Sequence, residues 1–321
     1  MVTLDDILLA QSRLQGISLR TPLVRCFTGD ETALYLKPES FQPIGSFKLR
    51  GAYNKVASVP EADRQRGVVS YSSGNHAQGV AYAARALRVK CVIVMPRSAP
   101  KVKMDATAAL GAEIVTVGAG SDERMKRAEE LAEQHGYVIV PPYNDEHIIA
   151  GQGTVGIEIV NDLKDVDLVL CPVGGGGLIS GVSTAIKLSG SRAKVIGVEP
   201  ELANDAQQSF RAGHVIAIPA ERATGTLADG LRTQSIGPIN FEHIRKYVDD
   251  IITVTETEIR SAMRRMVTTA RIVAEPSGAV TLAAWLFHRT QLPESSKAVA
   301  IVSGGNVEPD LLAEVLKTGE Q

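Results

Sequence analysis

Lys48 is the residue of this sequence best suited to act as a nucleophile. It follows Gly45, Ser46 and Phe47 in the segment IGSFKLRGAYNKV, where a helical pattern begins. A lysine near a helix N-terminus and inside a cleft has a lowered pKa, because both settings disfavour the charged ammonium. A lysine that forms a Schiff base needs such a lowered pKa. Most lysines are solvated surface charges, which is the alternative for this position taken alone.

A run of four glycines, Gly174 to Gly177, is suited to bind an anion. It follows a strand-like segment at 168–173 and precedes a helical pattern that begins near Leu178. Successive glycines let backbone N–H groups converge on one point, and a helix N-terminus adds about half a positive charge there. The sequence therefore predicts a phosphate site, with a flexible turn as the alternative.

Small polar residues gather at the start of another helical pattern, in the segment SYSSGNHAQG. They are Ser72, Ser73, Gly74, Asn75 and His76. Hydroxyl, amide and backbone donors at a positive helix end are suited to bind a carboxylate. A simple helix cap is the alternative interpretation.

A second glycine pattern, Gly151, Gly153 and Gly156, formally matches the dinucleotide-binding pattern G-x-G-x-x-G. That pattern is meaningful only between a strand and a helix, and the preceding segment PYNDEHIIA does not resemble a strand. We interpret the match as coincidental. A dinucleotide-dependent oxidoreductase is therefore the less favoured class of enzyme.

Short β-branched runs alternate with helical segments along the chain. Strands that are apolar on both faces and alternate with helices indicate parallel sheets covered by helices on each side. There are too many such units for one simple sheet, so two lobes are expected. The pairs are 68–72 with 75–88, KCVIVMP with 101–110, AEIVTVG with 121–135, 168–173 with the helix from 178, KVIGVEP with a short helix, and KAVAIVSGG with PDLLAEVLK.

The composition is that of an ordinary globular protein. The 321 residues suffice for roughly two domains. A net charge of -2 provides no basic field for nucleic acid, and no apolar run approaches the ~18 residues of a membrane span. The N-terminus predicts an amphipathic helix with a capping box from Thr3 to Asp6, not a signal peptide. We expect a cytoplasmic protein that binds neither nucleic acid nor membranes.

Three cysteines cannot all pair within one chain. They are Cys26, Cys91 and Cys171, and two of them lie inside apolar strand-like runs. Unpaired core thiols in a reducing compartment are expected.

Five motifs together resemble the fold-type II pyridoxal phosphate (PLP) enzymes, which include serine and threonine dehydratases and serine racemases. The motifs are SFKLRGA, SSGNHAQG, AGQGT, PVGGGGLISG and IVSGGN, and the resemblance runs from Arg20 to Asn306. It implies a two-lobed α/β fold like that of tryptophan synthase β, with open, twisted parallel sheets and helices on both faces. The larger, PLP-binding lobe is expected from 1–57 and 146–321, and a smaller mobile lobe from 58–145.

The resemblance also implies which residues bind PLP. Lys48 would hold the cofactor, the tetraglycine its phosphate, and Asn75 its ring hydroxyl. Ser303 would hydrogen-bond the pyridine nitrogen; as a neutral group it cannot fully protonate that nitrogen, which favours loss of a β-hydroxyl over transamination. The complete implied set is Phe47, Lys48, Asn75, Gly174, Gly175, Gly176, Gly177, Leu178, Glu275 and Ser303.

The activity implied by the resemblance is dehydration of a β-hydroxy amino acid such as L-serine or L-threonine to a 2-oxo acid and ammonia. A 3-hydroxyaspartate dehydratase and a serine racemase are the alternatives, and the segment AEPSGA around Glu275 looks like the racemase branch. Ser73 occupies the position of the second catalytic group in serine racemases, opposite Lys48. Arg124 would meet a substrate carboxylate, or is a surface helix charge. The implied substrate-binding set is Ser72, Ser73, Gly74, Asn75, His76 and Arg124.

A metal site is expected after the strand-like segment KVIGVEP. The segment VEPELANDA resembles the racemase-type cation site, in which Glu199, the carbonyl of Ala203 and Asp205 would be the ligands. These hard oxygens suit Mg²⁺, and also Ca²⁺ or Mn²⁺. Three surface residues at a strand end are the alternative. The resemblance further implies a homodimer or homotetramer.

Overall fold

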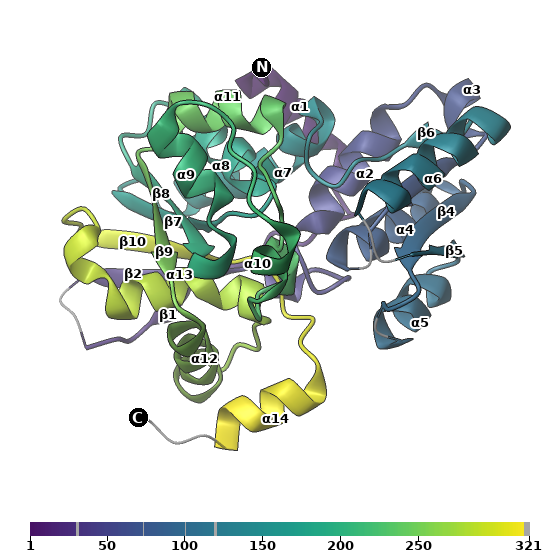
Figure 1. Cartoon of the computed structure of the whole chain (residues 1–321). Coiled ribbons are helices and arrows are strands. Elements are labelled where there is room, and N and C mark those ends of the chain that lie inside the picture. The colour runs from purple at the N-terminus through teal and green to yellow at the C-terminus, as the bar shows by residue number, and fades with distance from the viewer. Residues whose placement is uncertain (30–31, 73, 100, 119–120, 318–321) are drawn as a thin grey trace.

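The computed structural model describes residues 1–29, 32–72, 74–99, 101–118 and 121–317 (Figure 1). Its strands form two sheets, one of six strands in the order β1-β2-β10-β7-β8-β9 and one of four in the order β5-β4-β3-β6. Neighbouring strands are parallel except for the β1–β2 pair. The prediction of two sets of parallel strands with intervening helices is confirmed.

The six-stranded sheet comprises β1 (Val24–Cys26), β2 (Ala33–Pro38), β7 (Leu168–Pro172), β8 (Lys194–Pro200), β9 (Asp250–Val254) and β10 (Lys297–Val302). The four-stranded sheet comprises β3 (Val68–Tyr71), β4 (Cys91–Pro96), β5 (Glu113–Val117) and β6 (Val138–Ile139).

The α-helices are α1 (Leu4–Arg13), α2 (Lys48–Ser58), α3 (Glu61–Arg64), α4 (Asn75–Leu87), α5 (Lys101–Ala109), α6 (Ser121–His135), α7 (Glu146–Asp162), α8 (Gly177–Leu188), α9 (Asp205–Ala212), α10 (Ala220–Thr224), α11 (Pro238–Tyr247), α12 (Glu256–Arg265), α13 (Pro276–Phe287) and α14 (Pro309–Lys317). Short 3₁₀ turns are η1 (Glu39–Phe41), η2 (Glu201–Ala203), η3 (Asp229–Leu231) and η5 (Arg289–Gln291), and η4 (Met266–Ala270) is a π-helix.

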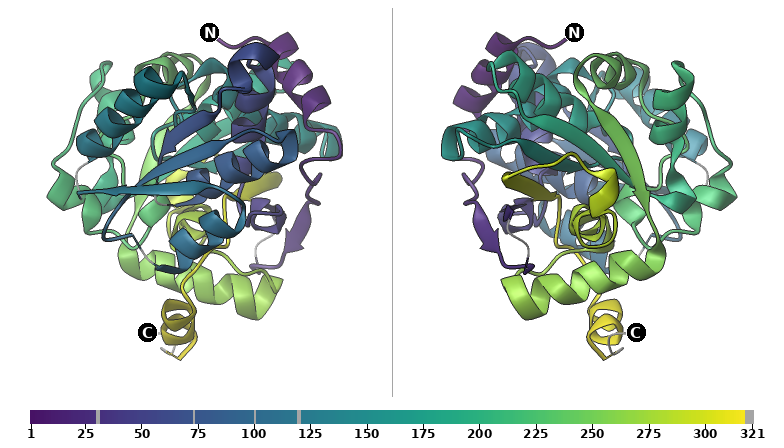
Figure 2. Two further views of the ribbon diagram at one scale, coloured as in Figure 1. Left: turned by 90° about the vertical axis from the view of Figure 1, so that its right-hand side faces the viewer. Right: turned by 90° about the vertical axis from the view of Figure 1, so that its left-hand side faces the viewer.

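The six-stranded sheet is buried on both faces because successive strand residues face opposite helix layers. Leu168 and Leu170 of β7 pack in one apolar cluster with α12 and α13, which includes Trp285. Val169 and Cys171 of the same strand pack in a second cluster with α7 and α8. Figure 2 shows helices on both sides of the sheets.

The four-stranded sheet is built in the same way. Ile93 and Met95 of β4 pack toward α2 and α4, whereas Val92 and Val94 pack toward α6. Helix α2 contacts both α4 and α7, so it lies between the helix layers of the two sheets (Figure 1).

Several local predictions can be checked directly. The capping box from Thr3 to Asp6 is present, and all three cysteines are buried and unpaired, as predicted. Gly151, Gly153 and Gly156 lie inside α7 rather than between a strand and a helix, so the dinucleotide-like match is coincidental. Among the described residues, no helix is both long and apolar enough to span a membrane.

A buried ion network joins α2 to the six-stranded sheet and to α7. Arg50 of α2 pairs with Glu39 at 2.8 Å and with Glu158 at 2.7 Å, and Lys37 of β2 pairs with Glu158 at 2.6 Å. The four side chains are at most 7% exposed. Burial alone would raise the pKa of Glu39, but Arg50 holds it below its usual value. The network therefore contains two cationic and two anionic side chains, whose charges balance in the protein interior.

Replacing Arg50 with Met should destabilise the protein by about 3–5 kcal/mol, because two buried carboxylates would lose their main partner. Urea unfolding followed by circular dichroism measures the loss. The control is Arg127→Met, which removes the cation of an exposed pair with Glu130 and should cost about 1 kcal/mol or less. Equal losses in the two variants would contradict this account of the network.

Candidate active site

Lys48 is the first residue of α2, as predicted, and its position is set by the turn before the helix. The backbone N–H of Phe47 donates to the carbonyl of Ser303 at 3.1 Å, which ties this turn to the end of β10. The Nζ of Lys48 donates to the carbonyl of Pro142 at 2.7 Å and lies 5.3 Å from the centroid of the Phe47 ring.

The amine of Lys48 is readily deprotonated. Loss of hydration lowers its pKa from 10.5 to about 8, and the carboxylate of Glu275 opposes part of this shift. The side chain of Lys48 is only partly exposed, so Lys48 is not an ordinary surface lysine. Near neutral pH a useful fraction of the amine is uncharged and nucleophilic.

The tetraglycine connects β7 to α8 and has no room for side chains. A Cβ on Gly175 would lie 2.4 Å from the ring of Tyr143, and one on Gly176 would lie 2.9 Å from the Cβ of Asn240. Gly176 also has a φ of 92°, which favours glycine. The side chain of Asn240 donates to the carbonyl of Gly175 and fixes the turn. The turn is therefore closely packed and not loose, and its role as a phosphate site stays a prediction.

Asn75 begins α4, and its amide is held in one orientation by two side chains. Its Nδ2 donates to Glu275 Oε1 at 2.8 Å, and its Oδ1 accepts from Asn306 Nδ2 at 2.8 Å. Asn306 also donates to the carbonyl of Ile44, beside the turn that carries Lys48. The N-cap residue of α4 is Gly74, so Asn75 is not the cap and its amide is free to make these side-chain contacts.

Glu275 lies buried among these groups. Burial raises its pKa to about 8, and the nearby carboxylate of Asp229 adds to the rise, while Lys103 and the hydrogen bond from Asn75 oppose it. Lys103 of α5 forms an ion pair with Asp229 of η3. Residues that flank the four-stranded sheet, Asn75 and Lys103, thus lie close to the buried carboxyl group of Glu275, which flanks the six-stranded sheet.

The other predicted binding residues have different surroundings. His76 is buried, its Nε2 lies 3.1 Å from the carbonyl of Val140, and burial followed by the charge of Lys48 lowers its pKa to about 3. It is therefore a neutral ring. Ser72 Oγ accepts from the N–H of Gly74 at 3.3 Å. Ser303 Oγ donates to the carbonyl of Ser277 at 3.2 Å.

Three further predicted residues, Ser73, Arg124 and Leu178, complete the set. Ser73 lies outside the described residues, so its role stays a prediction. Arg124 lies in the first turn of α6, where burial lowers the pKa of its guanidinium. Leu178 is buried in the first turn of α8.

The two carboxylates of the predicted metal site are both fully buried, so the surface alternative is wrong. Glu199 accepts from the N–H groups of Ala206 and Gln207 at 3.1 and 2.8 Å. Burial and the charge of Asp205 raise the pKa of Glu199 well above its usual value, and burial raises that of Asp205 to about 7. Asp205 Oδ2 has no hydrogen-bond partner among the described residues. Ala203 lies in the turn between β8 and α9.

Within the described part of the chain, no group of three or more His, Cys, Asp or Glu side chains is arranged to hold a metal. The Glu199 and Asp205 pair would need backbone carbonyls or water to complete a coordination shell. The expectation of a cation there stays a prediction.

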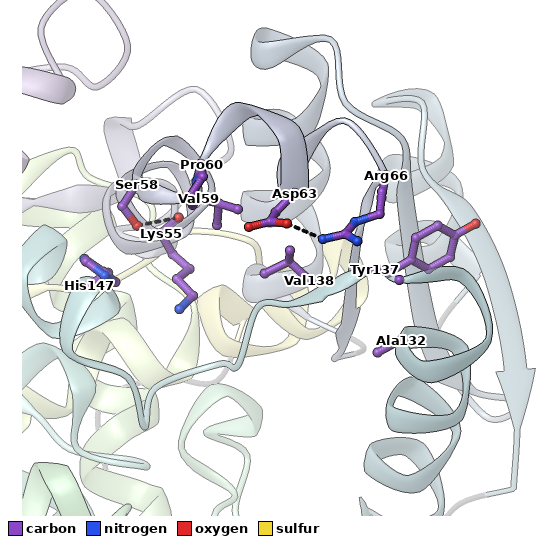
Figure 3. A pocket seen from close by; sticks show the side chains of 11 residues that line it. Lys55, Ser58, Val59, Pro60, Asp63, Arg66, Ala132, Tyr137, Val138 and His147 are labelled. Carbon is purple, nitrogen blue, oxygen red and sulfur yellow. Dashed lines mark hydrogen bonds and ion pairs between the residues drawn. The ribbon is translucent and has the colours of Figure 1, made fainter.

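A surface pocket of about 510 Å³ lies beside α2 and α3, away from the residues above (Figure 3). Its charged groups are already paired, Asp63 with Arg66 and Lys55 with Asp145. It is lined by Lys55, Ser58, Val59, Pro60, Asp63, Arg66, Ala132, Gly136, Tyr137, Val138 and His147. We therefore place the candidate active site at Lys48.

Sequence reasoning missed four residues of the site: Tyr143, Asn240, Lys103 and Asp229. Each acts through a partner that is distant in the sequence, and none lies in a recognised motif. Asn306 is the last residue of the motif IVSGGN, so the sequence could have indicated that it belongs to the site. Its contact with Asn75 could not be inferred from the spacing of the motifs.

The chain is similar to known proteins over nearly its whole length. The chain is 46% identical to an L-threonine ammonia-lyase of Thermotoga maritima, over 99% of this chain and 79% of the relative. It is 37% identical to an L-threo-3-hydroxyaspartate ammonia-lyase of Saccharomyces cerevisiae, over 99% and 97%. The structure of maize serine racemase superposes with a TM-score of 0.93 at 37% identity, covering 98% of this chain and 96% of that one.

Residues 15–304 match the family described as pyridoxal-phosphate dependent enzyme. That range includes Lys48, Asn75, the tetraglycine, Glu275 and Ser303. The chain belongs to the pyridoxal-phosphate dependent enzymes.

Proposed function

We propose that this protein is a PLP-dependent ammonia-lyase that converts L-serine, L-threonine or a related β-hydroxy amino acid into a 2-oxo acid and ammonia. The observation that carries the proposal is the Lys48 amine, whose pKa is lowered to about 8 at the start of α2. The residues fit PLP, because Gly175 and Gly176 exclude side chains from the turn that would receive the phosphate. PLP supplies an electron-withdrawing ring that makes the α-proton of a bound amino acid acidic.

The remaining chemistry falls to the chain's own groups. Lys48 would hold the cofactor, and its free amine would take the α-proton of the bound amino acid. The N–H groups of Gly174 to Gly177 bind the phosphate at the start of α8. The Nδ2 of Asn75 uses one N–H for Glu275, and its second N–H would be available to the ring hydroxyl of PLP. Ser303 is neutral and places no charge beside the ring nitrogen, which limits transamination.

The substrate carboxylate is assigned to the start of α4. Ser72, Ser73, Gly74 and the backbone N–H groups of this helix end supply donors without a formal charge. The neutral ring of His76 contributes shape and at most a hydrogen bond. Arg124 is assigned to a substrate carboxylate, and a second carboxylate on the side chain would make 3-hydroxyaspartate the better substrate.

Serine racemase activity is the second candidate. It is supported by the hydroxyl of Ser73, at the position opposite Lys48 in racemases, and by the likeness to maize serine racemase. Assays of the purified protein for 2-oxo acid and for D-isomer, with L-serine, L-threonine and both 3-hydroxyaspartates, distinguish the candidates. Only D-isomer with no 2-oxo acid would overturn the lyase proposal.

We infer that the two lobes comprise 1–57 with 146–321 and 58–145. The Asn75–Glu275 hydrogen bond and the Lys103–Asp229 ion pair both cross this boundary beside the site. Closure of the smaller lobe on substrate would then exclude water from Lys48. A cytoplasmic location and a homodimer or homotetramer remain predictions.

Lys48→Ala should lower 2-oxo acid production by at least about 10³-fold, because no other group would hold the cofactor and take the α-proton. Turnover is measured with each substrate at saturating PLP. Lys55→Ala is the matched control, since Lys55 lies on the same helix but pairs with Asp145. Unimpaired turnover by Lys48→Ala would refute the assignment.

Glu275→Gln should lower the pKa of Lys48 below about 8. A carboxylate favours the charged ammonium, so its removal makes deprotonation easier, while the amide can still accept from Asn75. The pH dependence of labelling at Lys48 by an amine-reactive reagent, read by mass spectrometry on cofactor-free protein, gives the pKa. Lys103 and Asp229 stay in place as the other nearby charges. A pKa that is unchanged or higher in the variant would contradict this coupling.

We further propose that Glu199 and Asp205, with the carbonyl of Ala203, hold a structural divalent cation such as Mg²⁺ or Ca²⁺. The buried and unpartnered Asp205 Oδ2 supports the proposal. Two carboxylates so close together repel each other, and a cation between them offsets that repulsion.

Chelation with EDTA should therefore lower both the melting temperature and the activity, and Mg²⁺ or Ca²⁺ should restore both. Asp205→Asn should abolish the response to chelator and cation, whereas Asp162→Asn, which removes an exposed carboxylate paired with Arg20, should retain it. Thermal unfolding with and without EDTA measures the effect. No change in the wild-type protein would refute the cation site.

A further inference from the structure

The glycines of α7 have a structural role that the dinucleotide-like pattern does not describe. We propose that Gly151 and Gly156 of α7 set the distance between Lys48 and the tetraglycine, and so hold the two attachment points of the cofactor in register. The inference rests on the proposed function, in which PLP is bound at both places at once.

On one side, α7 touches the helix that carries Lys48. A Cβ on Gly151 would lie 2.6 Å from the Cα of Gly51 and 2.7 Å from the carbonyl oxygen of Arg50. A Cβ on Gly51 would lie 2.8 Å from the carbonyl oxygen of Ile148. These are backbone atoms, which cannot rotate away as a side chain can. The crossing lies within one turn of Lys48, which begins α2.

On its other side, α7 touches the helix that begins at the tetraglycine. A Cβ on Gly156 would lie 2.8 Å from the carbonyl oxygen of Val182. A Cβ on Gly181 would lie 2.3 Å from the carbonyl oxygen of Ile149 and 2.5 Å from the nitrogen of Gly153. Gly181 is about one turn beyond Gly177, where α8 begins. Helix α7 therefore contacts both halves of the cofactor site through backbone.

Polar contacts prevent α2 from sliding along α7. The N–H of Gly51 donates to Gln152 Oε1 at 3.2 Å, and Arg50 donates to Thr154 Oγ1 at 3.1 Å and to Glu158 Oε1 at 2.7 Å. Further along the helix, Asn54 Nδ2 donates to the carbonyl of His147 at 2.7 Å. Close approach fixes the distance between the helices, and these bonds fix their register.

A fixed distance matters because a ligand held at two points gains from the second contact only if the spacing fits. Once one end of the ligand is bound, the other end has a high effective concentration at its own site only if the spacing of the two sites matches the ligand. If the sites are misplaced, the affinity for the whole ligand falls although each site alone is intact. Carbon atoms pack at about 3.5–4.0 Å, so a methyl group at either crossing would push the helices apart by roughly 1 Å. Such a shift would leave the lysine and the glycine turn unaltered and would change only their separation.

The test uses cofactor-free protein and three ligands. PLP contacts both attachment points. Pyridoxal lacks the phosphate and reports on Lys48 and the residues around the ring, and inorganic phosphate reports on the tetraglycine alone. Absorbance titration gives the affinity for PLP and pyridoxal, and titration calorimetry gives that for phosphate. The variants are Gly151→Ala, at the contact with α2, and Gly156→Ala, at the contact with α8.

Both variants should bind PLP at least about 10-fold more weakly than the wild-type protein, while their affinities for pyridoxal and for phosphate change by less than about 2-fold. Gly67→Ala is the control for lost stability. Gly67 has a φ of 123° at the start of the four-stranded sheet, where a Cβ would lie 3.0 Å from the Tyr137 ring. This variant should unfold more easily but keep its affinity for PLP.

The inference fails if the α7 variants keep the wild-type PLP affinity, or if they lose pyridoxal and phosphate affinity in proportion to PLP affinity. Should the alanine variants not fold, Arg50→Lys takes their place, because it keeps the buried charge but cannot bond Glu39 and Glu158 together; the same selective loss is expected. Absence of lysine-bound PLP or pyridoxal in the wild-type protein would instead refute the proposed function, and the inference with it.

Discussion

The close packing of α7 between α2 and α8 is the constraint on which the rest of the structure depends. Backbone atoms of the three helices approach each other where Gly51, Gly151, Gly156 and Gly181 lack side chains. The buried Arg50 network joins α2 and α7 to each other and, through Lys37 of β2, to the six-stranded sheet. Because α2 begins with Lys48 and α8 begins at the tetraglycine, this packing determines where Lys48 and the tetraglycine lie relative to each other.

Electrostatics at the site follow from burial inside this frame. Lys48 loses hydration and therefore loses its proton more easily, while Glu275 loses hydration and holds its proton more tightly. Glu275 offsets part of the shift of Lys48, so the charge state of the amine depends on a carboxyl group that also orients Asn75. A single buried residue thus links Lys48, the α4 helix end and the Lys103–Asp229 ion pair.

Local patterns in the sequence predicted β3, β4, β5, β7, β8 and β10 with the helix that follows each, the position of Lys48 in the first turn of α2 and the glycine turn after β7. They could do so because periodicity, caps and glycine runs are properties of neighbouring residues. They gave no prediction for β1, β2, β6 and β9 or for α11, α12 and α13. Tyr143 and Asn240 shape the glycine turn from far along the chain, and no local signal reveals such contacts. The glycines of α7 show the limit most clearly: their spacing was correctly rejected as a nucleotide motif, but only the packing of three helices reveals what they contact.

The most direct measurement of the central claim is the identity of the lysine that carries the cofactor. Reduction of the PLP-saturated protein with borohydride, digestion and tandem mass spectrometry would locate the attached group on the chain. The account predicts that it is found on Lys48, in stoichiometric amount and on no other lysine. Attachment at a different lysine, or no attachment at all, would contradict it.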